Sequence, residues 1–225
     1  MIEFSHGRTT SPDCLLDIRT TSDRVVQVSS KPAFKRAEPD ARRLSLIEAT
    51  ARVLARDGVA GTSVRSIAVE AGVSPGLVGH YFPGIDALIA ATYAHIEGQV
   101  SNALDAAVAE AAPTPRARLD AFVTASFRGP IADGQLLSTW IAFWSLVRSN
   151  RAIARQHDEQ YAAFRARVEN LLDDCGLAPE RQRSAAIAIT ALVDGLWLEL
   201  CLSPQAFRPD EAGAITRAAL DALLA

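Results

Sequence analysis

The sequence predicts an all-α protein in which a tri-helical helix-turn-helix domain is followed by a larger helical domain. Three observations support this fold class. Apolar side chains recur with a period of about 3.6 residues almost without interruption from Asp40 onward. Hydrophobic residues make up 49% of the chain but aromatic residues only 6%, which favours packed helices over a β-sandwich. No alternating run of β-branched or aromatic residues lasts more than a few positions.

The first three predicted helices are short and closely spaced. An apolar stripe of Leu44, Ile47, Ala51 and Leu54 marks the first, and Gly58 ends it because glycine can take a left-handed conformation. The other two helices begin at good capping residues. Their signals are a Ser63 cap, a tight turn at Gly72, then a Ser74 cap with Pro75 at the first helical position, continuing to about Phe82.

The third helix has an unusually slim outer face, formed by Pro75, Gly76 and Gly79. Two short helices joined around a glycine, directly after a longer helix, are typical of a tri-helical helix-turn-helix. A slim flank suits a helix that must approach the groove of a DNA duplex closely. The pattern therefore predicts that this helix is the recognition element.

Longer helices are predicted for the rest of the chain, and with them a division into three parts. We expect a disordered leader at 1–38, which shows no sustained period, the helix-turn-helix domain at 39–84 and a ligand-binding and dimerisation domain at 85–225. Within the last domain we expect helices at 85–112, 114–127, around 137–147, 151–174, 179–200 and 209–224.

Charge is distributed unevenly along the chain, whose formal net charge is −3. Residues 31–82 hold eight basic and five acidic side chains, whereas residues 83–225 hold 12 and 17. The positive charge is thus concentrated in the helix-turn-helix segment, where attraction to phosphates would act. The basic residues at 31–36 allow two interpretations, an arm that enters a minor groove or a solvated tail.

Several classes of site and location are not favoured. Cys14, Cys175 and Cys201 lie far apart and predict neither a disulfide nor a zinc site, and the four histidines show no metal-binding spacing. We expect no metal and no cofactor. Because no run of about 20 uncharged apolar residues and no secretory signal is evident, we expect a cytoplasmic protein without a membrane span.

The segment GVAGTSVRSIAVEAGVSPGLVGHYFPGIDAL, residues 58–88, closely resembles the DNA-binding region of TetR-family regulators. LSTWIAFWSLVRSN at 137–150 and ALVDGLWLELCLS at 191–203 resemble the C-terminal domain of the BetI-type subgroup. The resemblance implies a repressor that binds operator DNA and leaves it when a small-molecule effector binds. It also implies a homodimer formed by the last two helices, and apolar residues distributed around most of the 179–200 helix allow this.

The resemblance carries DNA-binding roles onto matching positions. Thr62, Ser63 and Tyr81 resemble phosphate-binding residues, although Ser63, like Ser74, is also expected as a helix cap. Arg43 and Arg65 are candidate phosphate clamps because guanidinium matches phosphate geometry. The expected recognition-helix positions are Ser74, Pro75, Gly76, Leu77, Gly79 and His80.

This sequence also departs from the family pattern. Many relatives have a lysine at the start of the fourth helix that touches the DNA backbone, and Ile85 stands there in this chain. The free amides of that helix start are a possible substitute. The recognition helix contains no Arg, Asn or Gln, so base choice would depend on the thymine methyl group, on His80 and on DNA shape.

Aromatic residues in the C-terminal domain suggest a ligand site. The candidate ligand-binding residues are Trp140, Phe143, Trp144, Asp194 and Trp197. One interpretation is plain core packing. The other is an aromatic cage for a choline-like cation, with Asp194 or Glu199 as the counter-charge.

Two other functional classes were weighed. Residues 72–76 match the GxSxG pattern of hydrolases, but that elbow needs a strand before its serine and the preceding residues are helical in pattern. We therefore expect no catalytic residues and no enzyme. A helical adaptor or interaction protein without DNA binding is the remaining alternative, which a mobility-shift assay distinguishes.

Overall fold

The computed structural model describes residues 37–225. In that range the chain is helical throughout and contains no strand, as the sequence predicts. The predicted leader lies outside the described residues, apart from its last two positions, which belong to the first helix. The helices are α1 (Ala37–Gly61), α2 (Val64–Glu70), α3 (Pro75–Tyr81), α4 (Ile85–Glu110), α5 (Pro115–Thr124), a 3-10 turn η2 (Ala125–Phe127), α6 (Gly134–Leu146), α7 (Arg151–Asp174), α8 (Pro179–Leu202) and α9 (Pro209–Leu224).

The predicted helix boundaries are confirmed at the helix-turn-helix. The Ser63 Oγ accepts the Ser66 amide at 3.0 Å, and the Ser74 Oγ accepts the Leu77 amide at 3.3 Å, so both serines act as N-caps. Gly58 and Gly72 have φ values of +62° and +65°, the left-handed conformation that ends a helix. After Gly58 one further helical turn continues α1 to Gly61, which the sequence did not predict.

The apolar face of α1 is divided between two cores. Leu46 and Val53 are fully buried in a small core with α2 and α3, whereas Leu54 packs into the large core of the C-terminal helices. Leu44, expected on the buried stripe, is 40% exposed, so that part of the prediction was wrong. A single stripe could not describe a helix that packs against neighbours on two sides.

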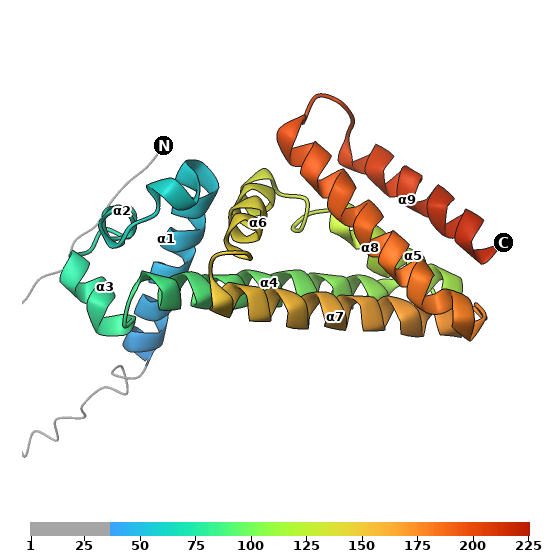
Figure 1. Ribbon diagram of the computed structural model, residues 1–225, viewed down its shortest axis with the longest axis horizontal. Helices are drawn as coiled ribbons and strands as arrows, with labels where there is room; N and C mark the ends of the chain where they lie inside the picture. The colour runs from blue at the N-terminus through green and yellow to red at the C-terminus, as the bar shows by residue number, and fades with distance from the viewer. Residues whose placement is uncertain (1–36) are drawn as a thin grey trace, which may run out of the picture. The chain divides into compact units, whose positions relative to one another are not determined.

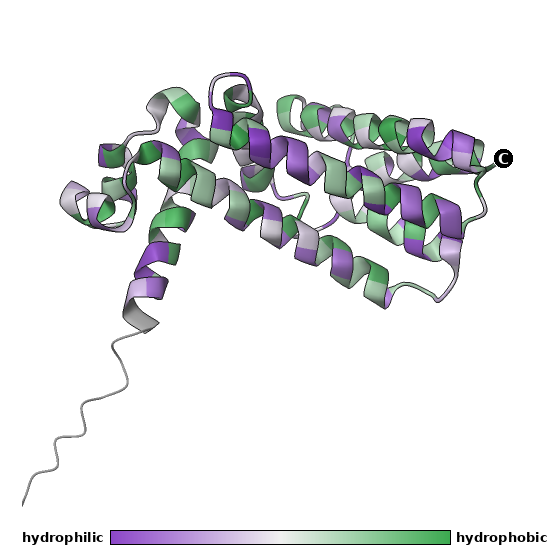
Figure 2. Cartoon of the chain, turned by 60° about the horizontal axis from the view of Figure 1, so that its bottom comes forward, coloured by the Kyte–Doolittle hydropathy of each residue, from purple (hydrophilic) through white to green (hydrophobic). Residues whose placement is uncertain are grey.

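The buried residues of helix α4 are also divided between the two cores. Its first turns place Leu88 in the small core, and from Ile89 onward its buried residues enter the large core. Farther along, α4 lies beside α7, and α8 crosses near them with α9 against its outer side (Figure 1). In the hydropathy colouring, green and purple residues alternate along most of these helices, as expected for amphipathic helices (Figure 2).

Helix α6 connects the two cores through α1. The hydroxyl of Thr139 on α6 shares its one proton between two carbonyls, that of Ala51 on α1 at 3.2 Å and that of Gln135 on its own helix at 2.8 Å, and both Thr139 and Ala51 are buried. The next residue, Trp140, is 3% exposed and belongs to the large core. A displacement of Trp140 would therefore be passed to α1 through its immediate neighbour.

Helix α8 is unusually apolar. By length and composition alone it would be long and apolar enough to cross a membrane. The test is weak, because the core helix of a soluble protein also passes it. Only 39% of the most apolar part of α8 is buried within the chain. Burial within one copy therefore does not account for its apolar surface.

Candidate functional site

Helix α3 presents one sealed side and one open side. Val78, 2% exposed, and Phe82, just after the helix and 3% exposed, seal it against α1 and α2. The opposite flank is solvent-exposed, and the residues on it are Ser74, Pro75, Gly76, Gly79 and His80. A Cβ built on Gly79 would meet no atom within 4 Å, so none of the residues that the structure describes covers this flank at Gly79. The slim outer face deduced from the sequence is thus open to a partner.

The side chains near the start of α2 have local roles. The Thr62 hydroxyl donates to the Gly58 carbonyl at 2.6 Å, which leaves its lone pairs free but commits its proton. Ser63 is exposed and forms a capping box with Ser66. Arg65 is exposed on α2, as expected for a side chain that reaches out to a phosphate.

Arg43 lies close to the end of α3. Its guanidinium carbon is 4.3 Å from the centroid of the Phe82 ring, a cation–π contact that holds the exposed Arg43 beside the recognition helix. Half-buried Tyr81 stacks edge-on against His80, with ring centroids 5.2 Å apart. The structure thus places Arg43, which lies far from α3 in the sequence, beside the end of the helix that carries His80 and Tyr81.

Part of the positive charge on this segment is neutralised. Glu70 accepts from Arg52 Nε at 2.7 Å and from Arg56 Nη1 at 2.8 Å, and these two bonds lower the pKa of Glu70. Among the described residues of α1 and α2, the exposed Arg42, Arg43 and Arg65 have no carboxylate within 4 Å. The count of eight basic side chains in residues 31–82 therefore overstates the number of guanidinium groups free for phosphates, because Arg52 and Arg56 are paired.

The start of α4 is a weaker anion site than the sequence suggested. Gly84 caps the helix without a side-chain hydrogen bond, so the first amides are free of side-chain partners. However, Asp86 lies in this first turn, where it accepts a hydrogen bond from Asn150 at 3.3 Å. A carboxylate at this position opposes the approach of a phosphate.

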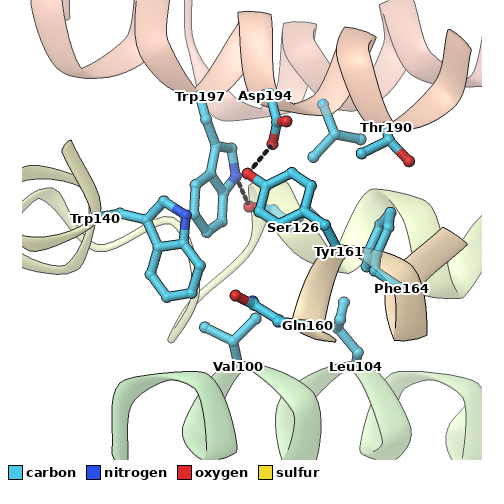
Figure 3. A pocket seen from close by; sticks show the side chains of 11 residues that line it. Val100, Leu104, Ser126, Trp140, Gln160, Tyr161, Phe164, Thr190, Asp194 and Trp197 are labelled. Atoms are coloured by element: carbon cyan, nitrogen blue, oxygen red, sulfur yellow. Dashed lines mark hydrogen bonds between the residues drawn. The ribbon is translucent and has the colours of Figure 1, made fainter. Parts of the chain in front are cut away.

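A small cavity of about 50 Å³ lies between α4, α6, α7 and α8 (Figure 3). This volume is below the roughly 300–1,000 Å³ usual for small-molecule sites, so a bound ligand would require the lining side chains to move apart. Aromatic rings and aliphatic side chains form most of its wall, with few polar groups. The lining residues are Val100, Leu104, Ser126, Trp140, Gln160, Tyr161, Phe164, Thr190, Val193, Asp194 and Trp197.

Asp194 is the only acidic residue in this lining. The Tyr161 hydroxyl donates to Asp194 Oδ1 at 3.1 Å and accepts from Trp144 Nε1 at the same distance. Burial raises the pKa of Asp194 to about 6, because no Lys or Arg of residues 39–225 lies within 4 Å to compensate the charge. The indole of Trp197 is held by a 2.8 Å hydrogen bond to the Ser126 carbonyl. The cavity therefore offers one uncompensated carboxylate among fixed aromatic rings.

Of the five candidate ligand residues, the structure brings Trp140, Asp194 and Trp197 to the cavity. Phe143 is fully buried, does not line it, and packs against the Tyr93 ring with centroids 4.9 Å apart. Trp144 stands behind Tyr161 and lines a separate outer hollow, whose other residues are Val147, Arg148, His157, Tyr161, Asp194, Gly195 and Leu198. Glu199 is exposed on α8 and lines neither space.

Three cavity residues on α7 were missed in the sequence, namely Gln160, Tyr161 and Phe164. The signal that was available is their spacing, because positions 160, 161 and 164 share one helical face. That face holds the two largest aromatic side chains of an otherwise charged helix. Without the packing partner, however, nothing in the sequence indicates which face of α7 meets a cavity.

The nucleophile interpretation of Ser74 finds no support in residues 37–225. Ser74 follows the Gly72 turn of a helix rather than a strand, and its hydroxyl oxygen caps α3. Within the same range no group of three or more potential metal ligands is clustered.

Comparisons with known proteins match both parts of the chain. Residues 46–92 match the family model "Bacterial regulatory proteins, tetR family", and residues 115–225 match "BetI-type transcriptional repressor, C-terminal". The chain is 36% identical over 186 residues to the HTH-type transcriptional regulator BetI of Burkholderia thailandensis, covering 82% of this chain and 94% of that protein. A BetI of Vibrio atlanticus is 32% identical, with 81% and 92% covered.

Solved structures give the same picture. A transcriptional regulator of Pseudomonas aeruginosa PAO1 is 43% identical with a TM-score of 0.76, covering 85% of this chain and 94% of that one. A regulator of Saccharomonospora viridis in complex with choline has a TM-score of 0.71, with 81% and 96% covered. Its identity is 17%, so this second likeness concerns the fold alone.

Proposed function

Because this chain belongs to the TetR family of transcriptional regulators and has a BetI-type C-terminal domain, we propose that it is a homodimeric repressor released from DNA by a small cation. It is a DNA-binding regulator and not an enzyme, and an adaptor without DNA binding is not favoured. Such a regulator works on chromosomal DNA, and we place it in the cytoplasm.

The observation that carries the DNA-binding mode is the open flank of α3 opposite its sealed side. We assign the major groove to Ser74, Pro75, Gly76, Leu77, Gly79 and His80, and the flanking phosphates to Arg43, Thr62, Ser63, Arg65 and Tyr81. Since Gly76 and Gly79 have no side chains, the α3 backbone can approach the base edges closely. His80 is the one side chain of the exposed flank with a ring donor for a base or a phosphate.

The proposed dimer uses an apolar stripe on α8. Exposed residues recur on it every three or four positions, namely Ile187, Ala191, Gly195, Leu198 and Leu202. On α9, Ile215 is 46% exposed as well. A second copy that covers this stripe would bury the surface that makes α8 apolar enough to resemble a membrane span. Two copies would place two α3 helices on two half-sites of an operator.

The dimer is tested by adding charge to the stripe. Ile187→Glu should convert the protein to a monomer in analytical ultracentrifugation, because a carboxylate would be buried against the partner. The matched control is Ala166→Glu, at an exposed position on α7. If Ile187→Glu remains dimeric at low micromolar concentration, α8 does not form the interface.

The effector is proposed to bind in the cavity around Asp194. A quaternary ammonium group is attracted by aromatic faces and by a carboxylate, and the cavity provides Trp140, Tyr161 and Trp197 together with Asp194. The choline complex of the Saccharomonospora viridis regulator supports this class of ligand. Because no Lys or Arg of residues 39–225 forms an ion pair with Asp194, a bound cation would supply a direct charge partner.

Release from DNA would follow from linkage between the two sites. A ligand that fits the non-binding arrangement better than the DNA-bound one must weaken DNA affinity by that difference. The structural connection we propose is α6, since Trp140 lines the cavity and Thr139 donates to Ala51 on α1. A shift of Trp140 around a ligand would then tilt α1 and with it α3.

A mobility-shift assay with the DNA upstream of the protein's own gene tests the proposal. We expect a shifted complex that weakens steeply with salt, because phosphate contacts release counterions. Millimolar choline should dissolve the complex, and calorimetry should record heat of binding. The repressor proposal fails if no DNA fragment from this region binds. The effector proposal fails if choline gives neither heat nor release.

A further inference from the structure

A second apolar hollow continues the cavity toward the outside. A groove of about 60 Å³ lies between α4 and α7, and it shares four lining residues with the cavity, Val100, Leu104, Gln160 and Phe164. We call this hollow the α4–α7 groove. Its additional lining residues are Glu97, Ser101, Phe122, Ala163 and Arg167. Because four side chains border both spaces, the groove and the cavity adjoin, and only these side chains separate the region of Asp194 from the α4–α7 groove.

The walls of the groove are mostly apolar and relatively rigid. The rings of Phe122 and Phe164 pack together with centroids 5.1 Å apart. At the junction with the cavity, Gln160 is held by the Tyr93 hydroxyl, which donates to its Oε1 at 2.6 Å. At the outer rim the Arg167 guanidinium lies 4.8 Å from the Phe122 ring centroid and is paired with Asp105. The charge of Arg167 at the rim is thus already compensated by Asp105, so it does not favour an anionic ligand.

The other way out of the cavity has a different chemistry. It leads past the hydrogen-bonded pair of Tyr161 and Asp194 into the outer hollow of Trp144. That hollow is lined by Arg148 and His157 and borders Leu198 of the α8 stripe. A positively charged side chain and a proposed dimer contact both disfavour an apolar ligand on this side. The α4–α7 groove is the apolar exit.

In Figure 3 Asp194 and Thr190 point into the cavity from α8, while Val100 and Leu104 point into it from α4. A ligand whose charge sits at Asp194 would therefore extend toward α4. We propose that the effector is an amphiphilic cation, with its ammonium head at Asp194 and an unbranched apolar chain that runs past Gln160 into the α4–α7 groove. This inference rests on the proposed function, since it concerns the same cavity.

The length of the ligand's alkyl chain is the variable that tests this inference. Calorimetric titrations of the full-length protein would use tetramethylammonium and then butyl-, hexyl- and octyltrimethylammonium, all below their micelle concentrations. Burial of one methylene is worth about 0.8 kcal/mol, so affinity should rise about three- to fourfold for each added methylene until the groove is filled.

Ala163→Trp is the diagnostic variant, because Ala163 is exposed and lines the groove but not the cavity. It should abolish the gain with chain length and leave tetramethylammonium affinity within about twofold. The matched control is Ala162→Trp, at the neighbouring exposed position that lines neither space, and it should keep the gain. Ser101→Phe narrows the groove from α4 and replaces Ala163→Trp should that variant not fold.

The possible failures can be told apart. If tetramethylammonium binds the unmodified protein but longer chains bind no better, the groove proposal is overturned and the proposed function stands. If both tryptophan variants keep the chain-length gain, the chain leaves the cavity elsewhere and the inference is overturned too. If no ammonium compound binds the unmodified protein, the cation-effector function itself fails.

Discussion

Helix α3 and the cavity between α4, α7 and α8 place their functional surfaces in opposite environments. The flank of α3 faces solvent and is built from backbone and small side chains, whereas its large side chains, Val78 and Phe82, are buried behind it. The cavity is enclosed by large aromatic side chains, and its single acidic group, Asp194, is held by Tyr161. The α3 flank is open because it carries few large side chains, whereas the cavity is lined by large side chains that point into it.

This difference predicts how each site responds to substitution. Substitutions that add a side chain to the α3 flank should weaken DNA binding, because the proposed function needs DNA to approach this flank closely. They should leave the fold intact. Substitutions that remove a polar or aromatic group from the cavity should weaken effector binding, because the proposed binding energy comes from a few fixed groups. The following experiments test this contrast.

Gly79→Glu should have the largest effect. The new side chain has free space in the protein, so folding should be unaffected, but its charge would face DNA phosphates. Like charges brought together at an interface cost several kcal/mol, and we expect operator affinity to fall at least about 100-fold in a mobility-shift titration. The control is Gly98→Glu in α4, which also has no atom within 4 Å of a built Cβ. Equal losses in both variants would contradict the assignment of α3.

Asp194→Asn should weaken binding of the cationic effector about 10- to 100-fold. A hydrogen bond or contact to a buried charge contributes roughly 1.5–3 kcal/mol, and the amide keeps the shape of the carboxylate. Thermal stability should be unchanged or slightly higher, because a buried charge is removed. Glu199→Gln removes an exposed charge from the same helix and should leave calorimetric affinity unaffected. A matching loss in Glu199→Gln would point to the other counter-charge.

Effector affinity should also depend on pH. Burial raises the pKa of Asp194 to about 6, and a cation binds the ionised carboxylate. Affinity for tetramethylammonium should therefore be constant above about pH 7 and fall below pH 6, approaching tenfold per pH unit. Nearby, burial and Asp194 raise the pKa of Tyr161, burial lowers that of His157, and Arg165 adds a permanent charge. Asp194→Asn should flatten the profile between pH 5 and 8, and an equally flat profile in the unmodified protein would exclude Asp194 as the counter-charge.

Arg43→Gln should have the smallest effect. It removes one proposed phosphate contact and the stacking on Phe82, so operator affinity should drop several-fold. The slope of log affinity against log salt concentration should decrease by about one for each subunit. Arg118→Gln, at an exposed site on α5, should change neither quantity. An unchanged salt slope for Arg43→Gln would remove Arg43 from the interface.

The sequence predicted the helix-turn-helix more completely than the cavity, for a physical reason. Caps and turns are local, so Ser63, Gly72 and Ser74 indicated where α2 and α3 begin and end without knowledge of distant contacts. Tryptophan is rare in this chain, and that alone pointed to Trp140 and Trp197. The inward-facing Gln160 and Tyr161 could not be distinguished from surface residues of a polar helix.

The remaining errors also come from tertiary packing. Helical spacing placed Phe143 with Trp140, but the cavity touches only one side of α6 and Phe143 lies on the side facing Tyr93. Leu44 was assigned to a single stripe on a helix that has two buried faces. Helical spacing shows which residues share a face of one helix. The neighbouring helices determine what that face contacts.

The sharing of α1 and α4 between the two cores has a consequence for melting. Leu46 and Leu54 lie about two turns apart on α1 yet belong to different cores. The adjacent Leu88 and Ile89 on α4 are divided between the same two cores. Neither half can lose its structure without exposing apolar surface of the other, so calorimetric heating should give one cooperative transition. A compound bound deep in the C-terminal bundle would then raise the melting temperature of the DNA-reading helices by the same amount.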